Sequence, residues 1–122
     1  MRAPNDYLND ILEQIQRIET FTEPGRDAFL HNDETQYAVI LAYVFIGKIA
    51  KHLPTALLDA HPQIDWRQIK GFRDFLIHSY HKIKAERVWE AVEDLPHLRV
   101  TVEAMQRELQ TGKSFEDGER KA

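Results

Sequence analysis

Apolar residues along this 122-residue chain recur in the steps of three and four that are typical of α-helices. The first such segment starts near Tyr7 and keeps one apolar face as far as Phe21. The Thr-Glu-Pro-Gly run at 22–25 is expected to end this helix. No stretch alternates with a period of two for long enough to predict a sheet.

A second helix is predicted to have Asp33 as its N-cap, since Asp33 is followed by Gln36 three residues later in the pattern of a capping box. It extends towards Pro54 and is apolar on nearly every side. A helix with one face exposed to solvent would carry polar residues along that face, and this pattern is absent here. The helix is therefore either the central element of the domain or one that also buries a face against another subunit.

The second half of the chain continues the helical pattern. Residues 55–60 can form at most a short turn of helix, and Asp65 is expected to cap a third long helix that reaches about Tyr80. A fourth helix is expected over 85–95, and Pro96 should break or kink the chain before a last helical segment. The buried residues of these two elements are expected to be Val88, Trp89, Val92, Leu98, Val102, Met105 and Leu109.

These elements together predict an all-α protein, a helical bundle of about four to five helices. We expect a single helical domain over 1–110 and a flexible, polar C-terminal tail over 111–122. The composition agrees with a folded domain, since 43% of the residues are hydrophobic and 30% are charged.

Composition and sequence also argue against several kinds of functional site and cellular location. The chain has no cysteine, which rules out thiolate catalysis, disulfides and Cys-ligated metal centres. The first residues do not resemble a signal peptide, and the longest uncharged run, 35–47, is too short to cross a membrane. We therefore expect a cytoplasmic protein without a membrane segment.

Charge is distributed unevenly along the chain. Sixteen basic and 20 acidic residues give a net charge of −4, which argues against a protein that depends wholly on nucleic-acid electrostatics. The segment 61–90 nevertheless carries six basic and four acidic residues, a balance of +2, and three of the six histidines. If the protein handles a polyanion, this segment is where we expect it.

The most suggestive chemistry within this segment is formed by Arg73, Asp74 and His78. Asp74 and His78 are four residues apart, so on a helix the carboxylate can orient the imidazole. Arg73 and His78 are separated by roughly 140° around the helix, but their ends can converge at the helix terminus or across a two-fold axis. An arginine and a histidine suffice to cleave RNA through its own 2′-hydroxyl. The same residues are also consistent with a surface ion pair beside a histidine that has no catalytic role.

The surrounding sequence resembles the HepT-like family of HEPN-domain proteins, which belong to prokaryotic toxin–antitoxin pairs. The resemblance extends from about Asp6 to Leu109. Its most specific part is an arginine, four residues, a histidine, one residue and a tyrosine, here Arg73, His78 and Tyr80. The stretches that carry it are 7–18, 35–40, 46–47, 61–66, 71–74, 88–89 and 94–96.

This resemblance implies a metal-independent endoribonuclease toxin without a cofactor. Members of the family are homodimers in which the arginine–histidine pairs of two subunits face a shared cleft. Arg73 would then stabilise the phosphate in the transition state, and His78 would act as general acid or base. The family most often has Asn after the arginine, whereas Asp74 would both orient His78 and repel RNA phosphate.

The resemblance also implies a partner. The antitoxin of the family is a minimal nucleotidyltransferase that attaches AMP to the motif tyrosine, here Tyr80. Lys82, Lys84 and Arg87 are candidates for contacts with the RNA backbone. The second helix is more apolar here than in the relatives, and this fits either a tight dimer, a face for a partner, or a simple core helix.

Two alternatives stay open from the residues alone. The chain could be a catalytically inactive helical binding partner of the nucleotidyltransferase, or a helical scaffold unrelated to RNA. A metal site is not expected, because His78 and His81 lack the acidic residues that a bundle site would add. Trp66 and Trp89 lie on apolar stripes and are interpreted as core residues rather than as platforms for bases.

Overall fold

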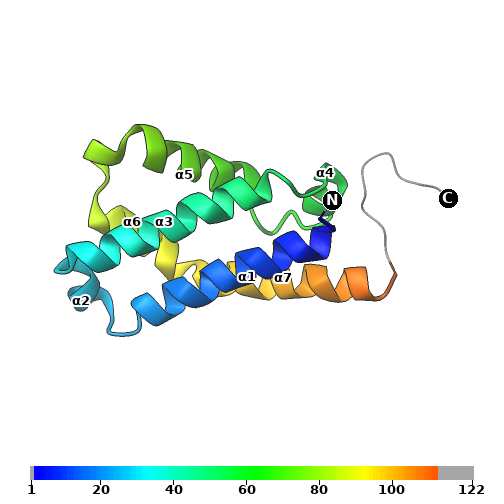
Figure 1. Cartoon of the computed structure of the whole chain (residues 1–122), viewed down its shortest axis with the longest axis horizontal. Helices are drawn as coiled ribbons and strands as arrows, with labels where there is room; N and C mark the ends of the chain where they lie inside the picture. Colours follow the sequence, from blue (N-terminus) through cyan, green and yellow to red (C-terminus); the bar gives the residue numbers. More distant parts are fainter. Residues whose placement is uncertain (1, 113–122) are drawn as a thin grey trace.

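The computed structural model describes residues 2–112, which form helices and connecting loops with no strand in that range (Figure 1). The all-α prediction is confirmed. In chain order the elements are α1 (Pro4–Phe21), α2 (Arg26–Leu30), α3 (Asp33–Ala50), α4 (Thr55–Asp59), α5 (Trp66–His78), the short 3-10 helix η1 (Tyr80–Lys82), α6 (Ala85–Glu93) and α7 (Leu95–Gln110).

Helix α3 is the centre of the bundle. It packs against α1 on one side and α5 on another, while α7 runs beside α1 and α2 lies at one end against α3 and α6 (Figure 1). Leu8, Ile11 and Ile15 of α1 are fully buried, as expected for the apolar face of the first helix. The contacts with α1 and α5 explain two of the apolar sides of α3, because these sides face neighbouring helices.

The start of α3 differs from the prediction by one residue. Asn32, not Asp33, is the N-cap, and its side-chain oxygen accepts a hydrogen bond of 3.0 Å from the Thr35 backbone N–H. The predicted capping box does not form, because the Gln36 side chain instead donates to the Phe29 carbonyl oxygen at 2.9 Å. Phe29 belongs to α2, a five-residue helix that the sequence pattern did not predict.

The predicted boundaries of the later helices are partly confirmed. Asp65 caps α5 by accepting a hydrogen bond from the Gln68 backbone N–H, as expected. However, α5 ends at His78 rather than Tyr80, and α6 ends at Glu93 rather than at residue 95. Pro96 lies in the first turn of α7, where its missing N–H costs no helical hydrogen bond.

The segment before α5 is fixed to α7 through a buried histidine. The His61 ring is 3% exposed, and its Nε2 lies 3.1 Å from Glu108 Oε1. Trp66, which is buried as expected for a core residue, donates from Nε1 to the His61 carbonyl oxygen. These contacts hold the first residue of α5 in place. The predicted tail at 111–122 lies almost wholly outside the described residues, so the predicted domain boundary stays a prediction.

Candidate active site

The place of Arg73 is set by a close approach of two helices. A Cβ atom built on Gly47 of α3 would overlap the Cβ of Arg73 on α5, so only glycine permits this packing. The stem of Arg73 therefore lies against α3, and its side chain is 23% exposed. Its Nε is buried and has no hydrogen-bond partner among the described residues, which leaves Nη1 and Nη2 as the ends that reach the surface.

Asp74 is engaged with basic groups rather than with the imidazole. Its Oδ1 accepts a hydrogen bond of 2.9 Å from Arg73 Nη1 and lies 3.7 Å from Nζ of Lys51, the residue that follows α3. This hydrogen bond from Arg73, with Lys51 adding a weaker effect, holds the pKa of Asp74 below its usual value. The Nη1 donor of Arg73 is thus already engaged by Asp74.

His78 is the last residue of α5 and is exposed. The imidazole of His78 makes no hydrogen bond with Asp74 or with any other residue within 2–112. Asp74 therefore does not orient the imidazole by a hydrogen bond within a single chain, although the His78 charge contributes slightly to lowering the pKa of Asp74. The end of α5 leaves the ring accessible to a ligand from solution.

The motif tyrosine follows directly after α5. Ser79 leaves helical geometry, and Tyr80 begins η1 with 72% of its surface exposed. Its ring lies edge-on to the His81 ring, with 5.8 Å between the centroids. The phenol of Tyr80 therefore lies in solvent, close in sequence to His78 and accessible to another protein.

The predicted basic rim is only partly directed at this surface. Lys82 and Lys84 are exposed in and after η1. Arg87, in contrast, lies over the Phe72 ring at 4.8 Å from the centroid, and its Nη1 is 3.9 Å from Glu90 Oε1. Its guanidinium is thereby directed towards α5. The structure adds Lys51, a basic neighbour of Asp74 that sequence reasoning missed because it lies far from Asp74 in the chain, directly after α3.

An apolar stripe on α3 is left uncovered by the rest of residues 2–112. Tyr37, Leu41 and Phe45 recur every fourth residue and are 73%, 54% and 41% exposed. Phe75 and Ile77 of α5 are also exposed. Large uncovered apolar side chains in series are typical of a surface that contacts another protein.

Residues 2–112 form neither a metal-binding cluster nor a membrane-spanning helix. Residues 2–112 contain no group of three or more His, Asp or Glu side chains arranged to hold a metal ion. None of the helices that the structure describes is long and apolar enough to cross a bilayer.

Comparison with known proteins identifies the family. The family model described as "Ribonuclease HepT-like" matches residues 11–105. The chain is 40% identical over 108 residues to a "Probable ribonuclease HepT" of Thermococcus cleftensis, an alignment that covers 87% of this chain and 98% of that protein. No solved structure matches the chain significantly.

More distant relatives carry similar names. A putative RNase of Methanocaldococcus jannaschii is 39% identical over 87 residues, covering 70% of this chain and 72% of that protein. A putative RNase of Caldanaerobacter subterraneus is 30% identical over 111 residues, covering 88% of this chain and 99% of that protein. The family model covers most of the chain, and the chain belongs to the HepT-like family.

Proposed function

We propose that this chain is a metal-independent endoribonuclease that acts as the toxin of a toxin–antitoxin pair. The observation that carries the proposal is the pairing of an anchored arginine with an accessible histidine on one helix. Arg73 is fixed by the α3–α5 contact, and His78 is exposed at the end of α5. The names given to the relatives, "Probable ribonuclease HepT" and a putative RNase, support the same activity.

The proposed reaction uses the 2′-hydroxyl of the RNA as nucleophile. His78 removes the proton from this hydroxyl while its oxygen bonds to the adjacent phosphorus, and the bond from phosphorus to the 5′ oxygen breaks. A protonated His78, supplied by the second subunit, gives a proton to the leaving oxygen. The products are a 2′,3′-cyclic phosphate and a 5′-hydroxyl, so neither a metal ion nor a cofactor is required.

Arg73 has the electrostatic role in this proposal. Negative charge grows on the two non-bridging oxygens of the phosphate as the reaction proceeds, and a guanidinium donates paired hydrogen bonds to such oxygens. The Asp74 carboxylate must leave Arg73 before the phosphate binds. Lys51 lies beside the same carboxylate and supplies a second positive charge for the incoming strand.

The proposed active unit is a homodimer. One chain brings a single Arg73 and a single His78, whereas acid and base must both be present for the reaction. The stripe of Tyr37, Leu41 and Phe45 gives α3 an apolar surface that a second copy would cover. A two-fold pairing is the usual arrangement for such a surface.

The proposed antitoxin is a minimal nucleotidyltransferase that modifies Tyr80. The phenol oxygen attacks the α-phosphorus of ATP, pyrophosphate leaves, and an AMP unit remains on the tyrosine. Each unit adds one negative charge and bulk next to the site, which competes with RNA for Arg73. Both RNA and ATP are abundant in the cytoplasm, and this is the proposed place of action.

The activity is tested with purified protein and a mixed RNA substrate in the presence of EDTA. We expect cleavage to persist with EDTA and to fall about 100-fold or more in His78→Ala, since general acid–base groups contribute about 10²–10⁴-fold. His81→Ala is the matched control, because His81 is exposed three residues away. Equal cleavage by wild type and His78→Ala would refute the role of His78.

The modification is tested with a purified nucleotidyltransferase of the proposed minimal type. Incubation with that enzyme and ATP should add the mass of one or more AMP units to wild type and none to Tyr80→Phe, as measured by mass spectrometry. Modified protein should no longer cleave RNA. Modification that persists in Tyr80→Phe would contradict the assignment of Tyr80.

A second candidate function is an inactive binding partner of the nucleotidyltransferase. The hydrogen bond between Arg73 and Asp74 favours it, because a carboxylate already occupies the proposed phosphate position. Asp74→Asn distinguishes the two candidates by removing the competing charge. A protein that binds the nucleotidyltransferase tightly but does not cleave RNA, even as Asp74→Asn, would support the inactive partner.

A further inference from the structure

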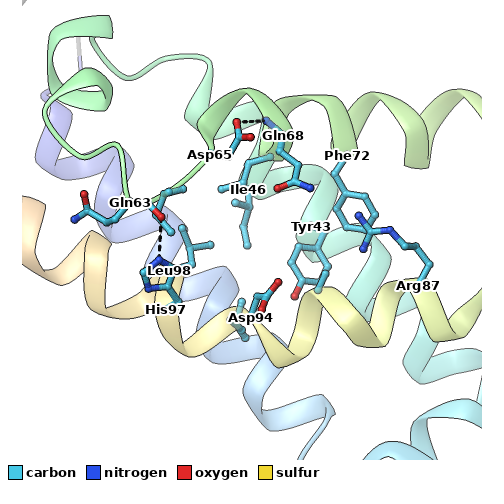
Figure 2. Close-up of a pocket in the computed structure, with 14 residues that line it drawn as sticks. Tyr43, Ile46, Gln63, Asp65, Gln68, Phe72, Arg87, Asp94, His97 and Leu98 are labelled. Atoms are coloured by element: carbon cyan, nitrogen blue, oxygen red, sulfur yellow. Dashed lines mark hydrogen bonds between the residues drawn. The ribbon is translucent and has the colours of Figure 1, made fainter.

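A cavity of about 330 Å³ lies between α5 and the segment formed by α6 and α7, with α3 behind it (Figure 2). Arg73, His78 and Tyr80 do not belong to its wall. The cavity is therefore separate from the candidate active site. Its volume is in the range that small-molecule sites occupy.

A buried hydroxyl of the cavity wall lacks a partner in residues 2–112. The Tyr43 hydroxyl is buried without a hydrogen bond, and the residue as a whole is 8% exposed. It points towards the carboxylate of Asp94, an exposed residue at the mouth of the cavity (Figure 2). Gln68, also exposed, places its side-chain amide in the same wall. A buried hydroxyl without a partner is uncommon in folded proteins and indicates a missing hydrogen-bonding group.

The remainder of the wall is suited to a flat, largely apolar ligand. Ile46 and Leu98 give it apolar surface, and the Phe72 ring lies under the Arg87 guanidinium at one edge (Figure 2). Asp65 and Asp94 outnumber Arg87 among the charged lining residues, so the wall is mildly negative. This charge disfavours a phosphate deep in the cavity and favours a ligand that presents N–H donors.

We propose that this cavity binds a guanine base, with Asp94 as the residue that reads its N–H edge. Guanine carries two adjacent N–H donors, at N1 and N2, that a carboxylate accepts together, and the neighbouring O6 accepts from Gln68 or Arg87. Adenine lacks the ring N–H of this pair. The base can come from a free guanosine or from an RNA strand, and the chemistry of the cavity is the same for both.

The proposal is tested by isothermal titration calorimetry of the wild-type protein. We expect guanosine to bind saturably with one site per chain and adenosine to bind at least tenfold more weakly. A deoxytetranucleotide with a single dG, which lacks the 2′-hydroxyl and resists cleavage, is the second ligand. Binding of guanosine alone assigns the cavity to a free nucleoside, and binding of both assigns it to a base in a strand.

Asp94→Asn is expected to weaken guanosine binding at least tenfold. Asn keeps the size of the side chain and is also a favourable residue before a helix, so α7 should still form. Glu93→Gln is the matched control, because Glu93 is an exposed carboxylate one residue earlier and is not part of the wall. Should Asp94→Asn fail to fold, Gln68→Ala provides the second variant and is expected to weaken binding several-fold.

The proposal is overturned if no nucleoside binds saturably, if adenosine binds as well as guanosine, or if Asp94→Asn binds guanosine like the wild type. None of these results depends on RNA cleavage. A chain that binds guanosine but does not cleave RNA would refute the proposed function and leave this inference intact. A chain that cleaves RNA but does not bind guanosine would refute this inference and leave the proposed function intact.

Discussion

Two regions of the α3–α5 pair hold polar groups under opposite conditions. Around Arg73, the charged ends are paired near solvent: Asp74, whose side chain is 49% exposed, accepts from Arg73 Nη1 at 2.9 Å, although the buried Arg73 Nε has no partner among the described residues. In the cavity, Tyr43 is 8% exposed and its hydroxyl has no partner among the described residues. Burial, together with the charge of Asp94, raises the pKa of Tyr43 well above its ordinary value.

This difference has a consequence for binding. Near solvent, one anion can replace another at Arg73 at low cost, because water compensates each change of partner. In a buried place, an unpaired hydroxyl costs free energy that is recovered only when a ligand supplies the missing hydrogen bond. The first region is therefore suited to exchange of substrate, and the second to selective recognition of one ligand.

The largest effect is expected from Leu41→Glu on the exposed stripe of α3. A carboxylate buried without a partner in a two-fold interface costs several kcal/mol, so the dimer should weaken about 100-fold or more. Size-exclusion chromatography with light scattering should show a monomer, and RNA cleavage should fall with it. Val100→Glu is the control, because Val100 is also an exposed apolar residue, 61% exposed, but lies on α7. An unchanged dimer in Leu41→Glu would place the interface elsewhere.

Gly47→Ala tests the close contact that fixes Arg73. The added methyl group would overlap the Cβ of Arg73, so the free energy of unfolding should fall by about 1–3 kcal/mol and Arg73 should move. Gly71→Ala on α5 is the matched control, since a Cβ there meets nothing within 4 Å. That variant should be stabilised by about 0.5–1 kcal/mol, because alanine is the better helix former. Urea unfolding of both variants measures the contrast, and equal effects would contradict the close-packing argument.

Tyr43→Phe tests the unpaired state of the buried hydroxyl. Removing a hydroxyl that has no partner should raise the free energy of unfolding by about 1 kcal/mol in the absence of ligand. Guanosine should at the same time stabilise the variant less than the wild type. Thermal unfolding with and without guanosine measures both effects. A variant that is less stable than the wild type would show that the hydroxyl is already satisfied in solution.

The smallest effect is expected from pH at Asp74. Its pKa is lower in the folded protein than in the unfolded chain because Arg73 donates a hydrogen bond to it. Such a carboxyl stabilises the fold above its unfolded pKa of about 4, and the contribution is lost as the pH falls through the folded pKa. Asp74→Asn should therefore flatten the decline of the melting temperature below about pH 4. Asp59→Asn, at an exposed carboxyl, should follow the wild-type profile.

Local sequence was sufficient for much of the fold. The buried face of α1 follows from apolar spacing alone, because every turn of a helix repeats the same face. Asp65 was predicted correctly as a cap since its hydrogen bond reaches only three residues ahead. The cap of α3 was misplaced because Asn32 and Asp33 are both good caps. The unpredicted α2 decides between them, since the Gln36 side chain binds Phe29 there.

The candidate site likewise contains some residues that local sequence indicates and some contacts that only the packing of the helices creates. Arg73, His78 and Tyr80 could be proposed from sequence, because the motif lies within one short stretch and resembles a known family. The partners of Asp74 were not predicted. His78 was the expected partner, whereas Asp74 accepts from Arg73, its neighbour in the chain. Lys51 also lies near Asp74, and this contact depends on how α3 lies against α5. The cavity with Tyr43 and Asp94 was likewise invisible in the sequence. Contacts between residues far apart in the chain depend on packing geometry, which no local pattern encodes, and only the tertiary structure decided them.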